Sequence, residues 1–436
     1  MSAVPQQLLS LPKVKGISSI DNRVHRIFPT NASGSTAFEY SGLNRIIFSM
    51  PAYKSGFYNP QRSFIHFEGK TGDSDTYFNA GIPVFNRMII RTGNGQVIED
   101  ISNVSTLSRL LSNFEADDRK RGTEDIVGDY RSSNTALTDT NTLATDHNSG
   151  RTFSTDLLSG LLGKAQQHYI PVGLFNASGG FSFEIELHLE DPKIACSSTS
   201  TSATSISYSL TNVSLQMEVV TLPSTVTDRL NSELQSDNKV SIPFATYRLH
   251  QAHFPQNSTS VDVNISESAH DLEAVYTVLR KQAYDIHTTG EYKSDNLNFI
   301  GGNNQSSNIL KSYQFRYDTK YMPDAKAEMN ANDNKLALLN ALHTLDLAGK
   351  SVYASNKGYW DTKGLCCIVQ SFKTSRDDFN NSLNSSSTGA PLELQIALKS
   401  AASIPMRIET FVKSNYTLSI MKGGMTTLLN GTVKAA

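Results

Sequence analysis

The chain has 436 residues, too many for one compact domain and enough for two domains of about 200 residues each. Its formal net charge of −2 gives no overall basic surface of the kind that nucleic-acid-binding proteins carry. Charged residues make up 18% of the chain, below the average for globular proteins. This composition suits many short strands joined by polar loops and argues against a helix-dominated enzyme.

The cysteines and the N-terminal segment indicate the cellular compartment in which the protein is expected and whether it is expected to bind a metal or cofactor. Three cysteines, Cys196, Cys366 and Cys367, cannot form a disulfide framework, and no His/Cys spacing resembles a zinc site. Residues 1–20 have no continuous apolar run or cleavage pattern, so we expect no secretory signal. No stretch of 18 apolar residues predicts a membrane-spanning helix. We therefore expect a reduced, intracellular protein with no metal and no cofactor.

The first half begins with strand patterns. Residues Arg62–Glu68 alternate and predict a strand with at least one buried face. Two apolar runs, 86–91 and 96–101, flank Asn94-Gly95, a dipeptide that tolerates the positive φ angles of a tight hairpin turn. Residues 105–114 carry apolar side chains at i, i+3, i+4 and i+7, which predicts one amphipathic helix.

A long polar segment separates these elements from the next strands. Residues 115–152 lack periodicity and predict a long loop. Phe181–Leu189 then places five apolar residues on one face and Ser, Glu, Glu and His on the other. Residues 206–222 return to alternation, and the polar segment 223–240 resembles a linker.

The second half repeats this pattern. A strand is expected at 242–254, and helical patterns occur at 269–282 and 335–347. Two alternating strands, 391–398 and 408–421, then close the chain as their counterparts close the first half.

The two pairs of closing strands form a quasi-repeat. Aligning Phe183 with Leu392 gives an offset of 209, and aligning Leu215 with Leu418 gives 203. The similar offsets predict a duplicated all-β domain. Short strands with one or two helices in the longer connections favour jelly rolls over immunoglobulin-like sandwiches.

We find no residue set that predicts catalysis. The pairs Asp117-Asp118 and Asp377-Asp378 are adjacent, and adjacent strand residues point to opposite faces, whereas loop pairs are usually solvated. His250 and His253 lie near a strand end without a carboxylate or cysteine at ligand spacing. Cys366-Cys367 lies in an apolar run, where cysteine packs as a small hydrophobe.

Other candidate sites are equally weak. Glu184 and Glu186, on the polar face of one strand, are the nearest match to the facing carboxylates of a glycosidase. Gly93-Asn94-Gly95 predicts a turn, and no phosphate-binding glycine motif is present. The basic cluster 119–121 lies beside Glu115, Asp117 and Asp118, which largely cancel its charge. We therefore predict no catalytic, cofactor-binding or metal-binding residues and no sequence-specific nucleic-acid binding.

The order of these features resembles the major capsid proteins of Polinton-like viruses and virophages. In the first half the resemblance covers most of residues 35–222, and in the second half it rests on the strand patterns at 243–254 and 390–421. The motifs that carry it in the first half are the strand beginning at Arg62, the hairpin 95–101, the helix around Leu107, the segment Ile170–Phe175 and the strand Phe181–Leu189.

The resemblance implies a fold and a function. It implies two tandem jelly-roll β-sandwiches with a few short helices in connecting loops, and homotrimers whose six rolls form a pseudo-hexagonal capsomer. Such capsomers tile an icosahedral shell around a DNA genome, so the expected location is the virion, after assembly inside the host cell. The expected partners are further copies, penton and minor capsid proteins, and an internal membrane beside the N-terminal segment.

We expect an N-terminal arm at 1–34, a first jelly roll at 35–222, a linker at 223–240 and a second jelly roll with a C-terminal tail at 241–436. The arm carries Leu8, Leu9, Leu11 and Val14 with Lys13 and Lys15, a mildly amphipathic pattern that is equally typical of a disordered terminus. The projecting loops would be 115–152 and 284–335.

Two alternatives remain at this stage. A lectin-like or adhesin-like β-sandwich binding protein would predict a secretory signal or an acidic calcium loop, and neither is evident in the sequence. A carbohydrate-active jelly-roll enzyme would need two facing carboxylates about 5 to 10 Å apart, for which Glu184 and Glu186 are the candidates.

Overall fold

The computed structural model describes most of the predicted strands. The described residues are 11, 13–14, 19–33, 36–78, 84–112, 147–175, 180–198, 206–237, 239–282, 310–328, 339, 343–344, 367–373, 382–386, 391–422 and 424–430. Most of the two predicted projecting loops lies outside this set, as does nearly all of the predicted helix at 335–347. Among the described residues, no helix combines the length and apolar character needed to cross a membrane.

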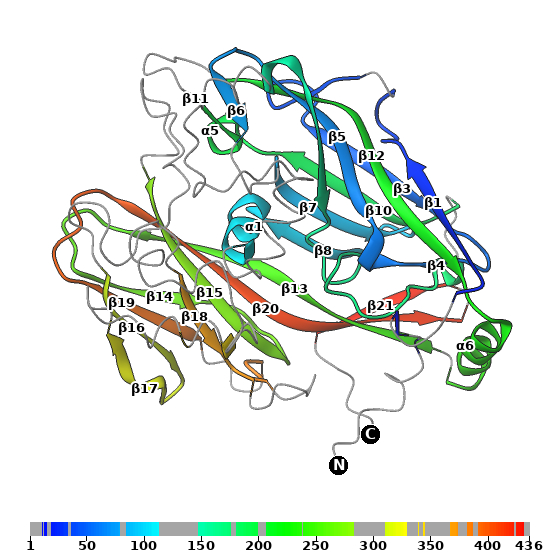
Figure 1. Cartoon of the computed structure of the whole chain (residues 1–436). Helices are drawn as coiled ribbons and strands as arrows, with labels where there is room; N and C mark the ends of the chain where they lie inside the picture. Colours follow the sequence, from blue (N-terminus) through cyan, green and yellow to red (C-terminus); the bar gives the residue numbers. More distant parts are fainter. Residues whose placement is uncertain are drawn as a thin grey trace.

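The first β-sandwich consists of two antiparallel sheets (Figure 1). One sheet has the order β1 (Asp21–Ile27), β12 (Tyr208–Thr221), β5 (Phe64–Thr71), β9 (Arg151–Asp156). The other has the order β3 (Arg45–Pro51), β10 (Phe181–Leu189), β7 (Phe85–Thr92), β8 (Val97–Ser102). Short strands complete it: β2 (Phe38–Glu39) and β4 (Phe57–Tyr58) pair with β12, and β6 (Thr76–Phe78) pairs with β11 (Cys196–Ser198).

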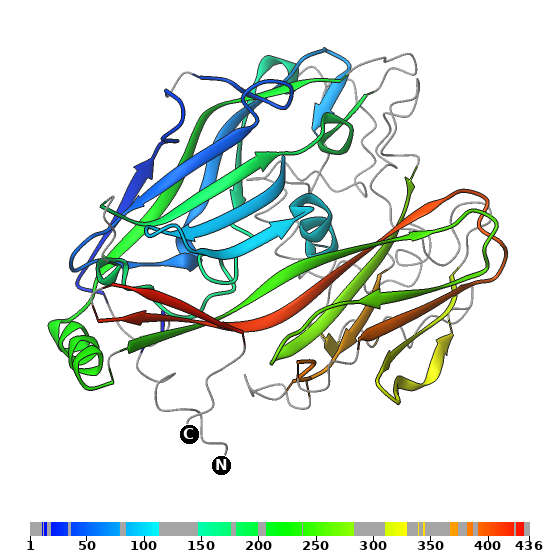
Figure 2. The ribbon, with the colours of Figure 1, turned by 180° about the vertical axis from the view of Figure 1, so that it is seen from behind.

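The second β-sandwich is built in the same way (Figure 2). One sheet has the order β13 (Lys239–Phe254), β20 (Met406–Met421), β15 (Leu272–Lys281), β18 (Ile368–Ser371), and β21 (Thr426–Asn430) also pairs with β20. The other has the order β14 (Ser260–Ile265), β19 (Leu392–Leu398), β16 (Leu310–Tyr317), β17 (Lys320–Glu328).

The two sandwiches share one topology. Among the main strands of each, the first, eighth, third and sixth in chain order form one sheet, and the second, seventh, fourth and fifth form the other. This arrangement is the jelly roll, so the predicted fold class is confirmed. The strands that we aligned as a repeat occupy equivalent places, because β10 corresponds to β19 and β12 to β20.

Burial explains why these segments form strands. Along β19 the burial alternates strictly, with Leu392, Leu394, Ile396 and Leu398 inside. The predicted hairpin is also confirmed, since β7 pairs with β8 and Gly95 has a φ of 84° in the turn between them. The predicted helix appears as α1 (Val104–Ser112), which buries Leu107 and Leu110.

One secondary-structure prediction is wrong. We expected a helix at 269–282, but the chain forms strand β15 there. The strand lies between β20 and β18, and residues 271–280 are all buried, so it shows no alternation between an inner and an outer face. An apolar run buried on both faces has no strand period, and its apolar spacing can match a helix by coincidence.

Regular structure also occurs in the segments that we assigned to an arm and a linker. Strand β1 lies inside residues 1–34 and pairs with β12, and Leu11 is buried in the core. Helix α6 (Ser224–Ser236) lies inside residues 223–240 and connects β12 to β13. The short helix α5 (Pro192–Ala195) precedes β11.

Candidate functional site

The predicted carboxylate pair lies on the outer face of β10. Arg91 donates a hydrogen bond to Glu184 at 3.2 Å and another to Glu186, and His188 lies 2.9 Å from Glu186. Burial acts to raise the pKa of Glu186, but Arg91, with smaller effects from Arg45 and His188, outweighs it, and the pKa falls below its ordinary value. A carboxylate held ionised in an ion pair is a poor proton donor, so Glu186 is unsuited to the role of general acid in a glycosidase.

The structure does not bring the other candidate residues together. Nε2 of His250 lies 3.1 Å from Glu267, whereas His253 is exposed. The two histidines are three positions apart along β13, so their side chains point to opposite faces of the strand. Cys367 is buried, as expected for a packing role. The pairs at 117–118 and 377–378, the basic cluster 119–121 and Cys366 lie outside the described residues.

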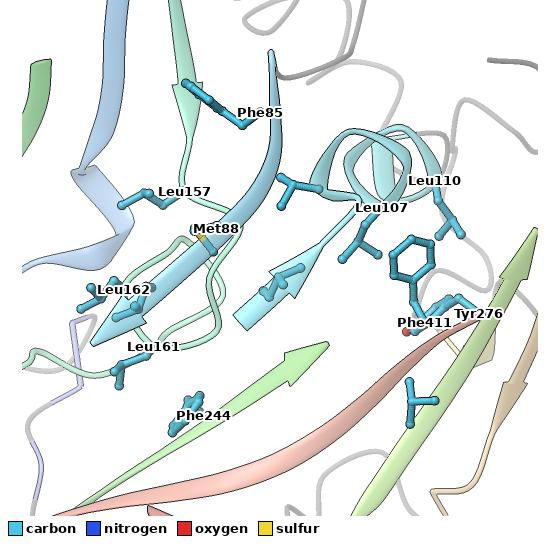
Figure 3. Packing of buried hydrophobic residues seen from close by; sticks show 14 of the residues in the cluster. Phe85, Met88, Leu107, Leu110, Leu157, Leu161, Leu162, Phe244, Tyr276 and Phe411 are labelled. Atoms are coloured by element: carbon cyan, nitrogen blue, oxygen red, sulfur yellow. The ribbon is translucent and has the colours of Figure 1, made fainter. Parts of the chain in front are cut away.

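No group of three or more His, Cys, Asp or Glu side chains within the described part of the chain is placed to hold a metal ion. The feature that stands out is instead the junction between the two jelly rolls. Buried apolar residues of both rolls form one continuous cluster. Figure 3 shows Leu107 and Leu110 of α1 pointing toward Phe411 of β20 and Tyr276 of β15. The two cores are therefore joined by apolar packing through α1.

A buried carboxylate organises a second contact across the junction. Glu99 of β8 is 1% exposed and accepts hydrogen bonds from the Ser159 hydroxyl and from the backbone N–H groups of Gly160 (3.0 Å) and Leu161 (3.3 Å). Its pKa is raised above the ordinary value because burial disfavours the charged form more than these donors favour it. Glu99 thereby fixes the loop around Gly160.

This loop packs directly against the second roll. A Cβ atom added to Gly160 would lie 1.5 Å from the backbone oxygen of Ala245 in β13, so only glycine permits the observed approach. Nearby, the Gln166 side-chain amide donates to the backbone oxygen of Pro243 at 3.0 Å. The first roll therefore contacts the backbone of β13 at two adjacent points.

A third contact is ionic. Arg280 of β15 donates to Glu409 of β20 at 2.6 Å, and both side chains are almost completely buried. From the first roll, the side-chain amide of Asn103 donates to the same Glu409 oxygen at 3.0 Å. The Arg280 charge also acts on Glu190 at the end of β10, although burial leaves the pKa of Glu190 raised. A buried ion pair of the second roll thus receives a hydrogen bond from the first.

The junction can fix the orientation of the two rolls. It combines apolar packing, a close backbone approach and a hydrogen-bonded ion pair, which together oppose the independent motion usual for adjacent domains. Sequence reasoning missed Glu99, Arg280 and Glu409. The one available signal was a charged residue directly after an apolar one inside a predicted strand, as in Ile98-Glu99 and Ile408-Glu409.

Sequence comparisons identify no relative: no family model matches the chain, and no curated protein matches it. Solved structures do match over nearly the whole length. PBCV-1 VP54, fitted into a reconstruction of the virophage Sputnik, has 13% identity and a TM-score of 0.63, with 95% of this chain and 98% of that chain covered.

Two further capsid proteins match at similar coverage. The Faustovirus major capsid protein has 9% identity and a TM-score of 0.57, covering 92% of this chain and 90% of that one. The mavirus major capsid protein has 10% identity and a TM-score of 0.53, covering 96% and 93%. Identities this low establish architecture alone. The chain has the double jelly-roll fold of virophage and giant-virus major capsid proteins.

Proposed function

We propose that this chain is a major capsid protein whose homotrimers form pseudo-hexagonal capsomers of an icosahedral virion shell around a DNA genome. The observation that carries the proposal is the pair of jelly rolls with identical strand order, in a chain that matches major capsid proteins over more than nine-tenths of its length. Three copies of such a pair present six similar rolls, which suits packing on a hexagonal lattice.

The junction supports the same proposal. A shell subunit must present the same surfaces to every neighbour, because closed symmetric assembly repeats one contact many times. Two rolls that turned freely would present variable surfaces. The contacts of Leu107, Gly160 and Glu409 hold them in one orientation, so the chain behaves as a single building block.

The remaining parts of the proposal concern partners and boundaries. The partners are neighbouring capsomers, penton and minor capsid proteins, and an internal membrane near the N-terminal segment. The chain divides into an arm (1–20), a first roll that begins with β1 (21–222), a linker that contains α6 (223–238) and a second roll that begins with β13 (239–436). It is located in the virion after assembly inside the host cell and has no enzymatic role, which agrees with the ion-paired state of Glu184 and Glu186.

Mass photometry of the purified protein tests the proposal. Three times 47.8 kDa gives an expected particle of about 143 kDa, with an obligate interface above about 2,000 Å². Negative-stain images at high protein concentration should show hexagonal platelets. A monomer at every concentration, without platelets, would refute the proposal and favour a monomeric β-sandwich binding protein, which a glycan array would then probe.

A further inference from the structure

A short segment of the second roll is fastened over the start of β15. This segment, residues 382–386, is called the strap. Leu272 and Leu383 exchange two backbone hydrogen bonds, at 2.9 and 3.2 Å. The backbone N–H of Ser385 donates to the Ala269 backbone oxygen at 2.8 Å, and the Ser385 hydroxyl oxygen accepts from the Ala269 N–H at 2.9 Å. The strap therefore behaves as an added strand segment held by a few adjacent bonds.

The strap is bonded to the residues on either side of Asp271, whose carboxyl group is buried. Asp271 directly precedes Leu272 and is 4% exposed. No described residue makes a hydrogen bond of good geometry to either of its carboxylate oxygens, although the Asn415 side chain is near enough to favour the ionised form in part. Its backbone oxygen accepts from the Asn415 N–H at 2.9 Å, which holds the residue in place while β15 and β20 stay paired. A buried carboxylate with so little hydrogen bonding is costly when ionised, because water cannot solvate it.

The neighbouring lysines relieve Asp271 only in part. Lys373 favours its ionised form, but Lys373 and Lys413 both bind Glu273, at 3.0 and 2.7 Å. They outweigh the effect of burial and lower the pKa of Glu273, so that carboxylate remains ionised and adds a like charge near Asp271.

The remaining titratable groups on this side of the roll are already engaged. Nδ1 of His270 lies 2.9 Å from the Ser386 hydroxyl. Glu267 contacts Arg248 at 3.2 Å and His250 at 3.1 Å. Asp271 is therefore the group in this cluster whose ionisation the closed structure opposes.

We propose that Asp271 and the strap form a proton-controlled clasp, closed while Asp271 is protonated and opened more readily once it ionises. Opening the strap breaks its bonds to Ala269 and Leu272 and lets water reach the carboxylate. The proposal concerns local opening within one chain and is independent of the capsid function proposed above.

The direction of the effect follows from linkage. Burial, with the Glu273 charge, raises the pKa of Asp271 from 3.8 to about 6, although Asn415 and Lys373 act in the opposite direction. The closed form therefore binds a proton in a pH range where the solvated carboxyl has already released it. Between these two pKa values the opening equilibrium constant rises about tenfold per pH unit, and above the higher value it is constant. Acidification from neutral pH therefore closes the clasp.

Hydrogen exchange of the intact protein, followed by mass spectrometry, tests the proposal. After correction for intrinsic exchange rates, the amides of 267–272 and 382–386 should be protected about tenfold more at pH 5 than at pH 7. The range stops at pH 5 so that Glu273 stays ionised. Asp271→Asn, which keeps the shape and removes the charge, should show no such change.

Asp262→Asn provides the matched control, because Asp262 is exposed on β14 of the same roll. This variant should keep the full pH response. An equal response in Asp271→Asn and the unmodified protein would overturn the proposal. If Asp271→Asn does not fold, the unmodified protein still provides a test. Equal protection of the two segments at pH 5 and pH 7 would then overturn the proposal.

Discussion

At the scale of single residues, buried charges are the costliest features of this protein. The Arg280–Glu409 pair is nearly fully removed from water, and each partner compensates the other. Arg280→Met removes the closer and more deeply buried of the two arginines that contact Glu409 and leaves Arg407 at 3.6 Å, so we expect a loss of up to about 3–5 kcal/mol in the free energy of unfolding. Urea denaturation measures this loss.

A double substitution separates the charge from the packing. Adding Glu409→Leu to Arg280→Met removes the uncompensated charge, so the double variant should be more stable than Arg280→Met alone. The control is Arg316→Met, which breaks the half-exposed Arg316–Glu393 pair and should cost less than about 1 kcal/mol. Equal losses in Arg280→Met and Arg316→Met would contradict the argument.

Gly160 tests the backbone contact between the rolls. Gly160→Ala places a methyl group 1.5 Å from a backbone oxygen that cannot move without disturbing β13. We expect a loss of about 1–3 kcal/mol or more in the free energy of unfolding, measured in urea. In the control Gly42→Ala, the new Cβ has its nearest neighbour at 4.0 Å, and stability should stay within about 0.5 kcal/mol. A neutral Gly160→Ala would mean that the loop does not pack on β13.

At the scale of elements, α1 is the helix on which the junction depends. Leu107→Ala removes a fully buried side chain that faces Phe411 (Figure 3), and should cost about 2–5 kcal/mol in unfolding free energy. Leu111→Ala changes the same residue type on the same helix, where the leucine is only partly buried, and should cost clearly less. Chemical denaturation of both variants measures the two losses. A larger loss in Leu111→Ala than in Leu107→Ala would mean that α1 does not pack through the face that carries Leu107.

The elements that could be predicted are the strands in which apolar and polar residues alternate. Strand β19 buries alternate residues, and β10 alternates apolar with polar residues although Ser182 and Glu186 are also buried, so the strand period is visible in both sequences. Asn94-Gly95 determined the hairpin. Strand β15 was not predictable in this way, because all of residues 271–280 are buried and the period disappears. The junction was equally hidden: Arg280 and Glu409 lie 129 positions apart, and no local pattern signals their contact.

At the scale of the whole molecule, the question is whether the two rolls unfold as one unit. Adjacent domains with small polar interfaces usually unfold separately. Here apolar residues of both rolls belong to one cluster, Gly160 of the first roll packs against the backbone of β13, and Asn103 of the first roll donates a hydrogen bond to Glu409 of the second. Unfolding one roll would expose apolar surface and buried carboxylates of the other, which couples the two transitions.

Hydrogen exchange at increasing urea concentration measures this coupling. Peptides from β10 in the first roll and β19 in the second should lose protection at the same urea midpoint, since opening either roll removes the support of its neighbour. In Leu107→Ala the junction is weakened while both strands keep their own sheets, so the two midpoints should separate. Distinct midpoints in the unmodified protein would show that the rolls are independent domains, and the fixed orientation inferred from the junction would then be wrong.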